Sequence, residues 1–173
     1  MNKFARIAAA AAVAAFFATP SFAAPVGASP AAKAKVAIVK PLTLTKVLDL
    51  DFGTLTLGNN LGATPVTISL DRTTGNIGCA TDVTCPVSGT RGEYKVTGVN
   101  NNTVTINVAS SNLSNLTTPT AAPISFTPTA QTSVALGNSG AAGVNFLVGG
   151  SISVSSATAE GNYSGDMDVT VNY

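Results

Sequence analysis

The C-terminal residues of the chain alternate strictly between apolar and polar side chains. In an extended chain the apolar side chains share one face, which carries Met167, Val169, Val171 and Tyr173. The opposite face carries Asp166, Asp168, Thr170 and Asn172. A period of two is typical of a half-buried β-strand, because successive side chains point to opposite faces. We predict that this closing strand pairs with strands far back in the sequence and completes the fold.

Short alternating segments of the same kind recur along most of the chain. They span residues 42–57, 66–70, 94–96, 103–108, 124–126, 134–136 and 144–154. Gly, Asn and Pro separate them at intervals of roughly 8 to 12 residues, and no long window has a helical period. We therefore predict an all-β chain of roughly nine or ten short strands, folded as an antiparallel β-sandwich or barrel.

Residues 1–23 have the features of a secretory signal peptide. Lys3 and Arg6 form a short basic region, residues 7–18 are an unbroken apolar run, and small residues precede a cleavage site after Ala23. The run is too short to cross a bilayer as a helix, which needs about 20 residues. We expect export to the periplasm, the cell surface or the extracellular medium, with no transmembrane helix.

The exported chain is predicted to consist of two parts. Residues 24–35 are small and contain Pro, which indicates a flexible N-terminal arm, and residues 36–173 are expected to form a single β-sandwich domain. Val36 and Ile38 lie on one face of a short apolar segment. This segment is either the first strand of its own domain or a strand exchanged between chains. We favour the first interpretation, and hence a monomer over a strand-exchanged polymer, because enough strands follow to complete a sandwich.

The apolar faces of the predicted strands define a candidate core. We expect its members to be mostly buried, and they are Val36, Ile38, Leu44, Leu50, Phe52, Ile68, Val96, Val104, Ile106, Val108, Phe126, Phe146, Val169 and Val171.

Charge and composition disfavour several functions. The full chain has nine basic and eight acidic residues, and removing Lys3 and Arg6 leaves seven against eight, a net charge of −1. This charge attracts neither nucleic acid nor an anionic membrane. The chain has no His, the commonest general base and metal ligand, and it lacks the Ser-x-x-Lys and Gly-x-Ser-x-Gly motifs. We therefore expect no catalytic activity, no cofactor and no metal.

Cys79 and Cys85 lie close together in a segment rich in turn-forming residues. In an exported protein, two such cysteines most often form a disulfide. Free thiols and a redox role are the alternatives. A redox pair usually has a Cys-x-x-Cys spacing, and a metal site would need further ligands. We predict a disulfide.

Two pairs of aspartates also share strand faces, namely Asp49 with Asp51 and Asp166 with Asp168. Either pair could contribute to a Ca²⁺ site, which needs six or more oxygen ligands. We favour a polar, outward-facing surface that discourages edge-to-edge aggregation.

Four segments carry a resemblance to a known family. They are Val39–Lys46, Leu50–Leu55, Phe146–Val154, and Gly161–Gly165 together with Val169–Tyr173. They resemble a family of bacterial secreted proteins described as a domain of unknown function, which is similar to spore-coat-U and fimbrial-subunit proteins. The resemblance implies an immunoglobulin-like, pilin-like β-sandwich at the cell surface, and it carries over no catalytic residues.

These observations lead to one expected function and two alternatives. We expect an exported structural or adhesive cell-surface protein, fimbrial-subunit-like and without catalytic activity, whose partners are other copies of itself or surface components. The first alternative is a secreted module that binds a glycan or a protein through Asn/Thr-rich loops. The second is a small outer-membrane β-barrel. The predicted strands argue against it, because most are shorter than the 9–11 residues that a membrane-spanning strand needs.

Overall fold

The computed structural model describes residues 23–139 and 142–173, so nearly all of the predicted signal peptide lies outside the described residues. The chain divides into two compact units, Met1–Ala37 and Ile38–Tyr173. In the first unit, the described residues form neither helix nor strand. All regular structure described lies in the second unit.

The second unit is all-β, which confirms the predicted fold class at this level. A single 3₁₀ turn, η1 (Gly137–Ser139), is the only helical element among the described residues. Those residues contain no helix long and apolar enough to cross a membrane. The strands are β1 (Thr43–Leu48), β2 (Thr56–Leu57), β3 (Val66–Leu70), β4 (Ile77–Gly78), β5 (Val83–Thr84), β6 (Gly92–Thr97), β7 (Thr103–Val108), β8 (Ser111–Asn115), β9 (Ile124–Ala130), β10 (Ser133–Ala135), β11 (Val144–Val154), β12 (Tyr163–Ser164) and β13 (Val169–Asn172).

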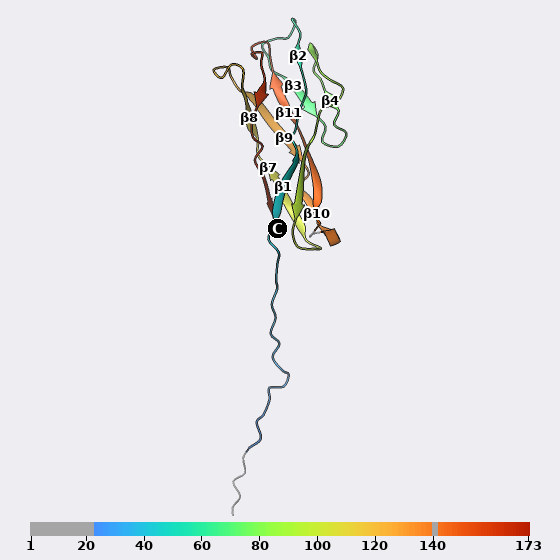
Figure 1. The fold of residues 1–173 in the computed structure, drawn as a ribbon, viewed down its shortest axis with the longest axis vertical. Helices are drawn as coiled ribbons and strands as arrows, with labels where there is room; N and C mark the ends of the chain where they lie inside the picture. The colour runs from blue at the N-terminus through green and yellow to red at the C-terminus, as the bar shows by residue number, and fades with distance from the viewer. Residues whose placement is uncertain (1–22, 140–141) are drawn as a thin grey trace, which may run out of the picture. The chain divides into compact units, whose positions relative to one another are not determined.

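Every strand pairing is antiparallel. The largest sheet has eight strands in the order β1-β6-β11-β9-β8-β12, with β3 beside β11 and β4 beside β3. A second sheet has the order β10-β7-β13, and β2 pairs with β5 in a third. Figure 1 shows β11 at the centre of the large sheet, next to β3 and β9.

The long strand β11 has three partners. It pairs with β6 over residues 144–148, with β9 over residues 148–152 and with β3 over residues 150–154. The partners crowd around Gly149 and Gly150. A Cβ atom at Gly149 would lie 2.3 Å from the Leu70 carbonyl oxygen, and one at Gly150 would lie 2.5 Å from the Phe126 ring. Only glycine leaves room for such close approach.

The core consists of two clusters of buried side chains. Cluster A contains Phe52, Leu61, Ile68, Leu70, Val83, Ile124, Phe126, Ile152 and Val154. Cluster B contains Tyr94, Val96, Val104, Ile106, Leu136, Phe146 and Val148. Phe52 packs edge-to-face on Phe126 in cluster A, with ring centroids 6.3 Å apart. Cluster B contains side chains of β6 and β11 together with side chains of β7, so the two larger sheets pack against each other through this cluster.

Most of the predicted core residues are buried or partly buried. Seven are buried, namely Phe52, Ile68, Val96, Val104, Ile106, Phe126 and Phe146. Five are partly buried, namely Leu44, Leu50, Val108, Val169 and Val171. The polar alternates along these strands, such as Thr105 and Thr170, are exposed.

The prediction for Val36 and Ile38 is wrong. Their side chains are 84% and 86% exposed, and residues 36–39 form no strand. The first strand begins instead at Thr43. Pro41 provides the physical reason, because its nitrogen cannot donate a hydrogen bond to a neighbouring strand and its ring fixes the backbone.

This correction leads to a stability test. Phe146→Ala removes a ring that is 2% exposed in cluster B, so we expect a loss of about 3–5 kcal/mol in the free energy of unfolding. Val36→Ala is the matched control and should change it by less than about 0.5 kcal/mol. Urea denaturation of the exported chain measures both values. Equal losses in the two variants would mean that residue 36 belongs to the core after all.

Candidate functional site

A groove of about 1290 Å³ opens in the second unit above cluster A. Residues 49–59 line one side, called here wall 1, and residues 158–167 line the other, called wall 2. The floor between them is apolar. It is formed by core side chains that include Phe126, Ile152 and Val154. These floor side chains are only 3–5% exposed, so the two walls already cover most of the core beneath the groove.

Apolar side chains also project from the walls themselves. Leu50, Leu55 and Leu57 of wall 1 are partly buried and pack against cluster A. Tyr163 and Met167 of wall 2 do the same from the other side. Partial burial indicates that further apolar contact is available to these side chains.

Wall 1 continues the path of β1 and is held by hydrogen bonds on one edge only. The Asp51 N–H and C=O both pair with Thr90, at 2.8 Å each. Successive residues of a β-strand direct their backbone N–H and C=O groups to opposite edges of the strand. The N–H and C=O groups of Leu50 and Phe52 therefore point to the edge of wall 1 that borders the groove. Further along, β2 pairs with β5.

Wall 2 is likewise held along its outer edge. β12 pairs with β8, and the Leu116 N–H donates to the Asn162 carbonyl at 2.7 Å. Within residues 23–139 and 142–173, no backbone hydrogen bond links wall 1 to wall 2. Two segments with one paired edge each therefore border an apolar floor.

The buried amide of Asn115 fixes the start of wall 2. Its Nδ2 donates to the Glu160 carbonyl at 3.0 Å, and its Oδ1 accepts the N–H groups of Thr117 and Thr118 at 2.8 Å each. Gly161 lies so close that a Cβ there would be 2.5 Å from Oδ1. A buried polar side chain with these bonds holds the wall in one conformation.

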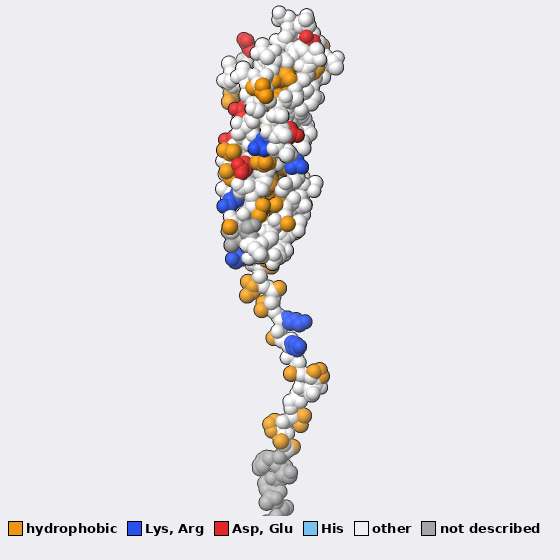
Figure 2. Space-filling view, turned by 90° about the vertical axis from the view of Figure 1, so that its right-hand side faces the viewer, with side chains coloured by type: hydrophobic (Ala, Val, Ile, Leu, Met, Phe, Trp, Pro, Cys, Tyr) orange, Lys and Arg blue, Asp and Glu red, His pale blue; other side chains and the backbone are white. Residues whose placement is uncertain are grey.

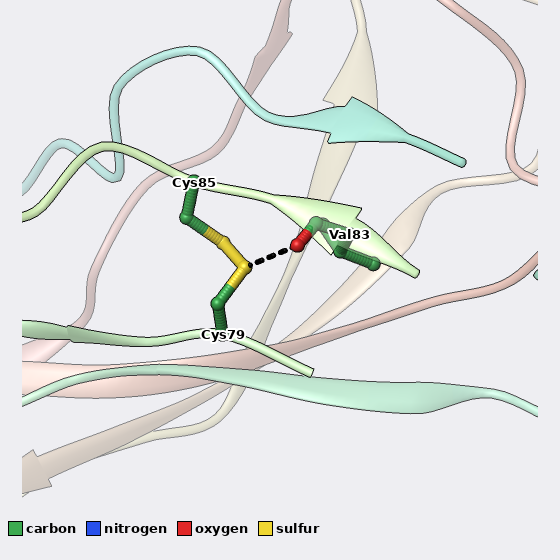
Figure 3. Close-up of a disulfide and its surroundings, with 3 residues drawn as sticks. All are labelled: Cys79, Val83 and Cys85. Atoms are coloured by element: carbon green, nitrogen blue, oxygen red, sulfur yellow. Dashed lines mark hydrogen bonds between the residues drawn. A yellow bond between two sulfur atoms is a disulfide. The ribbon is translucent and has the colours of Figure 1, made fainter. Parts of the chain in front are cut away.

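Cys79 and Cys85 form the predicted disulfide, with their Cα atoms 6.0 Å apart (Figure 3). The Cys79 sulfur lies 2.9 Å from the Val83 carbonyl oxygen, a close contact, because a disulfide sulfur has no proton to donate. The loop places Val83 in cluster A, where β5 pairs with β2 of wall 1. The disulfide therefore stabilises the loop whose strand β5 pairs with β2 of wall 1.

The groove carries excess negative charge. Its lining includes the carboxylates of Asp49, Asp51, Glu160 and Asp166 but only one cation, Lys46, which gives a net charge of −3. Lys46 donates to Asp49 at 2.7 Å, and this bond raises the pKa of Lys46. Three carboxylates are thus without a cationic partner among the described residues.

The aspartate pairs considered for calcium do not assemble in this structure. Among the described residues, no group of three or more His, Cys, Asp or Glu side chains lies close enough to hold a metal ion. Asp51 Oδ1 instead accepts the Gly53 N–H at 2.8 Å. Figure 2 shows that charged and apolar side chains form small separate groups on one face, within a largely uncharged polar surface.

The closing residues lie beside β7 and end on a tyrosine contact. Val169 and Val171 of β13 pair with β7 and, with Met167, pack against cluster B. The Tyr173 hydroxyl donates to the Lys40 carbonyl at 2.7 Å and accepts the Val99 N–H at 2.9 Å. Tyr173 therefore fixes Lys40, just before the first strand. The alternating pattern places Tyr173 on a face but gives no sign of this contact.

The disulfide allows a second test. A seven-residue closed loop is expected to contribute about 2 kcal/mol through the unfolded state. The double variant Cys79→Ala/Cys85→Ala should therefore unfold about 2 kcal/mol more easily than the wild type. Urea denaturation with and without a reducing agent measures this, because reduction should bring the wild type to the level of the variant and leave the variant unchanged. A wild type insensitive to reduction would contradict the stabilising role.

Comparison with known proteins identifies the family of the chain. No curated protein and no solved structure matches the chain. The family whose description is "Domain of unknown function (DUF4402)" matches residues 42–173, which is most of the chain and includes both walls of the groove. The chain therefore belongs to the DUF4402 family.

Proposed function

We propose that this protein is an exported structural or adhesive subunit of the bacterial cell surface, fimbrial-subunit-like and without catalytic activity, whose groove receives an extended polypeptide strand. The observation that carries the proposal is the groove itself, in which two walls with free backbone edges border an apolar floor. Free edges and an apolar surface are the two requirements for strand addition.

Wall 1 offers two short stretches beside which a strand could pair. Asp51 forms an isolated bridge to Thr90 and Thr56–Leu57 form β2, whereas Gly53 between them has a φ of +72°, so the wall is not one continuous strand. A strand placed beside them could pair its backbone with wall 1 and direct alternate side chains to Phe126 and Ile152. Alternating side chains give specificity in this mode of recognition, whereas backbone hydrogen bonds contribute sequence-independent affinity.

Two further features support the surface assignment. The signal-like residues 1–23 favour export, and the Cys79–Cys85 disulfide is typical of an oxidising compartment. The shared core of the two larger sheets favours an immunoglobulin-like, pilin-like sandwich, an architecture that surface proteins use widely. The groove is then the position of a missing strand.

A glycan-binding module is the second candidate, because the same groove offers sugar-binding groups. Asn59 and Asn162 lie on opposite walls, and Tyr163 adds an aromatic ring. Amides and aromatic rings are suited to sugar hydroxyls and faces. The leucine side chains of wall 1 and the free edges favour a polypeptide strand instead.

The proposal is tested by locating the protein on intact cells of the source bacterium. An antibody to the second unit should label unpermeabilised cells, and gentle shearing should release the protein as multimers. A permeabilised sample and a known periplasmic protein serve as controls for leakage. Labelling that appears only after permeabilisation, with a monomer in the soluble fraction, would contradict the surface assignment.

A further inference from the structure

We propose that residues 33–40 bind a negatively charged lipid surface. This segment lies outside the groove, so the inference goes beyond the proposed function and does not depend on it. Val36 and Ile38 were expected in the core, but they are 84% and 86% exposed, and Val39 beside them is 66% exposed. Neighbouring apolar side chains that face water mark a surface for a protein, a membrane or a ligand.

Charge is distributed unequally between this segment and the rest of the exported chain. Residues 24–40 have three basic side chains, Lys33, Lys35 and Lys40, and no acidic one, which gives a charge of +3. Residues 41–173 have four basic and eight acidic side chains, which gives −4. The net charge of −1 therefore conceals a basic segment on an acidic chain. An anionic surface attracts this segment although it does not attract the chain as a whole.

The segment combines the two kinds of side chain that suit a lipid–water interface. Val36, Ile38 and Val39 each lie within two residues of a lysine. A lysine has a long flexible stem, so its ammonium group stays among the lipid phosphates while the neighbouring apolar side chains enter the acyl boundary. A soluble polyanion such as nucleic acid would bind the lysines but leave the apolar side chains in water. The combination therefore favours lipid.

The backbone of the segment limits how deeply it can enter. Residues 33–40 form neither helix nor strand. Among residues 23–139 and 142–173, none makes a backbone-to-backbone hydrogen bond with residues 33–39. Unpaired N–H and C=O groups do not enter the hydrocarbon core, where no water can bind them. In the head-group layer, water and phosphate oxygens satisfy these groups. The segment is therefore suited to lie in that layer and not to cross the membrane.

A short connection joins the segment to the strands. The Tyr173 hydroxyl donates to the Lys40 carbonyl at 2.7 Å and accepts the Val99 N–H at 2.9 Å. Pro41 follows, and β1 begins at Thr43. Lipid contact at residues 33–40 would thus keep the strands close to the lipid surface. Since residues 41–173 are net negative, the electrostatic attraction comes from the segment alone.

Vesicle binding tests the inference. The exported chain, residues 24–173, is used because the apolar signal-like residues would contact lipid themselves. It should sediment with vesicles of phosphatidylcholine and phosphatidylglycerol in equal amounts, but not with phosphatidylcholine alone. Raising the ionic strength from about 0.1 M to about 1 M shortens the Debye length from about 10 Å to about 3 Å and should release most of the protein. Equal binding to both kinds of vesicle, or no binding to either, overturns the inference.

Charge variants locate the contact. Lys33→Gln/Lys35→Gln should bind anionic vesicles about 25-fold more weakly, because each lysine near such a surface contributes about fivefold to binding. Arg72→Gln/Lys95→Gln is the matched control. It removes the same charge from partly or fully exposed side chains outside the segment, and it should weaken binding by less than about threefold. Equal losses in the two variants would mean that net charge, and not the segment, determines binding.

Apolar variants distinguish a lipid surface from a soluble polyanion. Val36→Ser/Ile38→Ser keeps all three lysines and should bind anionic vesicles about tenfold more weakly. Val87→Ser/Leu116→Ser is the matched control, since these side chains are 87% and 66% exposed in the second unit, and it should bind like the wild type. If the first variant also binds like the wild type, the segment is a general polyanion site and the lipid assignment fails.

A fluorescent reporter measures entry into the interface directly. The chain has no tryptophan, so Ile38→Trp gives emission from this position alone. Its emission should shift to shorter wavelength when anionic vesicles are added, whereas Val87→Trp should keep the emission of a water-exposed indole. An unchanged emission at residue 38 would overturn the inference even if the protein sediments with vesicles. The proposed function would then still stand if intact cells are labelled, because that experiment does not involve lipid binding.

Discussion

The fold depends on the pairing of β11 with three other strands. β6 occupies its first half, β3 its second half, and β9 lies along its middle. Because one strand carries three sets of hydrogen bonds, it links cluster B, through Phe146 and Val148, to cluster A, through Ile152 and Val154. Gly149 and Gly150 allow this arrangement, since any larger side chain there would collide with Leu70 or Phe126. The two clusters thus form around the two ends of one strand.

The groove follows from an asymmetry between these ends. Cluster B is covered by Val104 and Ile106 of β7, with Val169 and Val171 of β13 packed against it. Cluster A is covered instead by irregular chain, with Phe52 of wall 1 packed on Phe126 and with Leu61 and Val83 also buried in the cluster. Leu55 and Leu57 of wall 1, and Tyr163 and Met167 of wall 2, are only partly buried against it. The groove therefore lies where irregular segments, and not a paired strand, close the core.

The sequence was informative wherever a pattern was local. Alternation identified the closing strand and most of the core, because burial on one face of a strand imposes a period of two on the residues themselves. Residues 71–91 were harder, since β4 and β5 have only two residues each and present no period. The disulfide was predictable from the spacing and number of the cysteines.

Features that depend on contacts distant in sequence could not be predicted. The bonds of Asn115 to Glu160 and of Tyr173 to Lys40 join residues 45 and 133 positions apart, and neither leaves a trace in local composition. The groove is also invisible in the sequence, because its lining combines residues 46–61 with residues 152–167, which are far apart along the chain. Val36 and Ile38 show the same limit, since an apolar alternating segment has the same pattern whether it pairs within its own chain or elsewhere.

A chain with free strand edges and an exposed apolar segment must avoid random association. Unpaired edges are templates for any extended chain, and proteins usually protect them with charge, proline or short strands. Here the groove has a net charge of −3 beside its unpaired edges, and Lys33, Lys35 and Lys40 flank the exposed side chains of Val36, Ile38 and Val39. Each place thus carries charge of one sign, which opposes the pairing of that place with the same place on another copy. Charge therefore protects both features without any additional covering element.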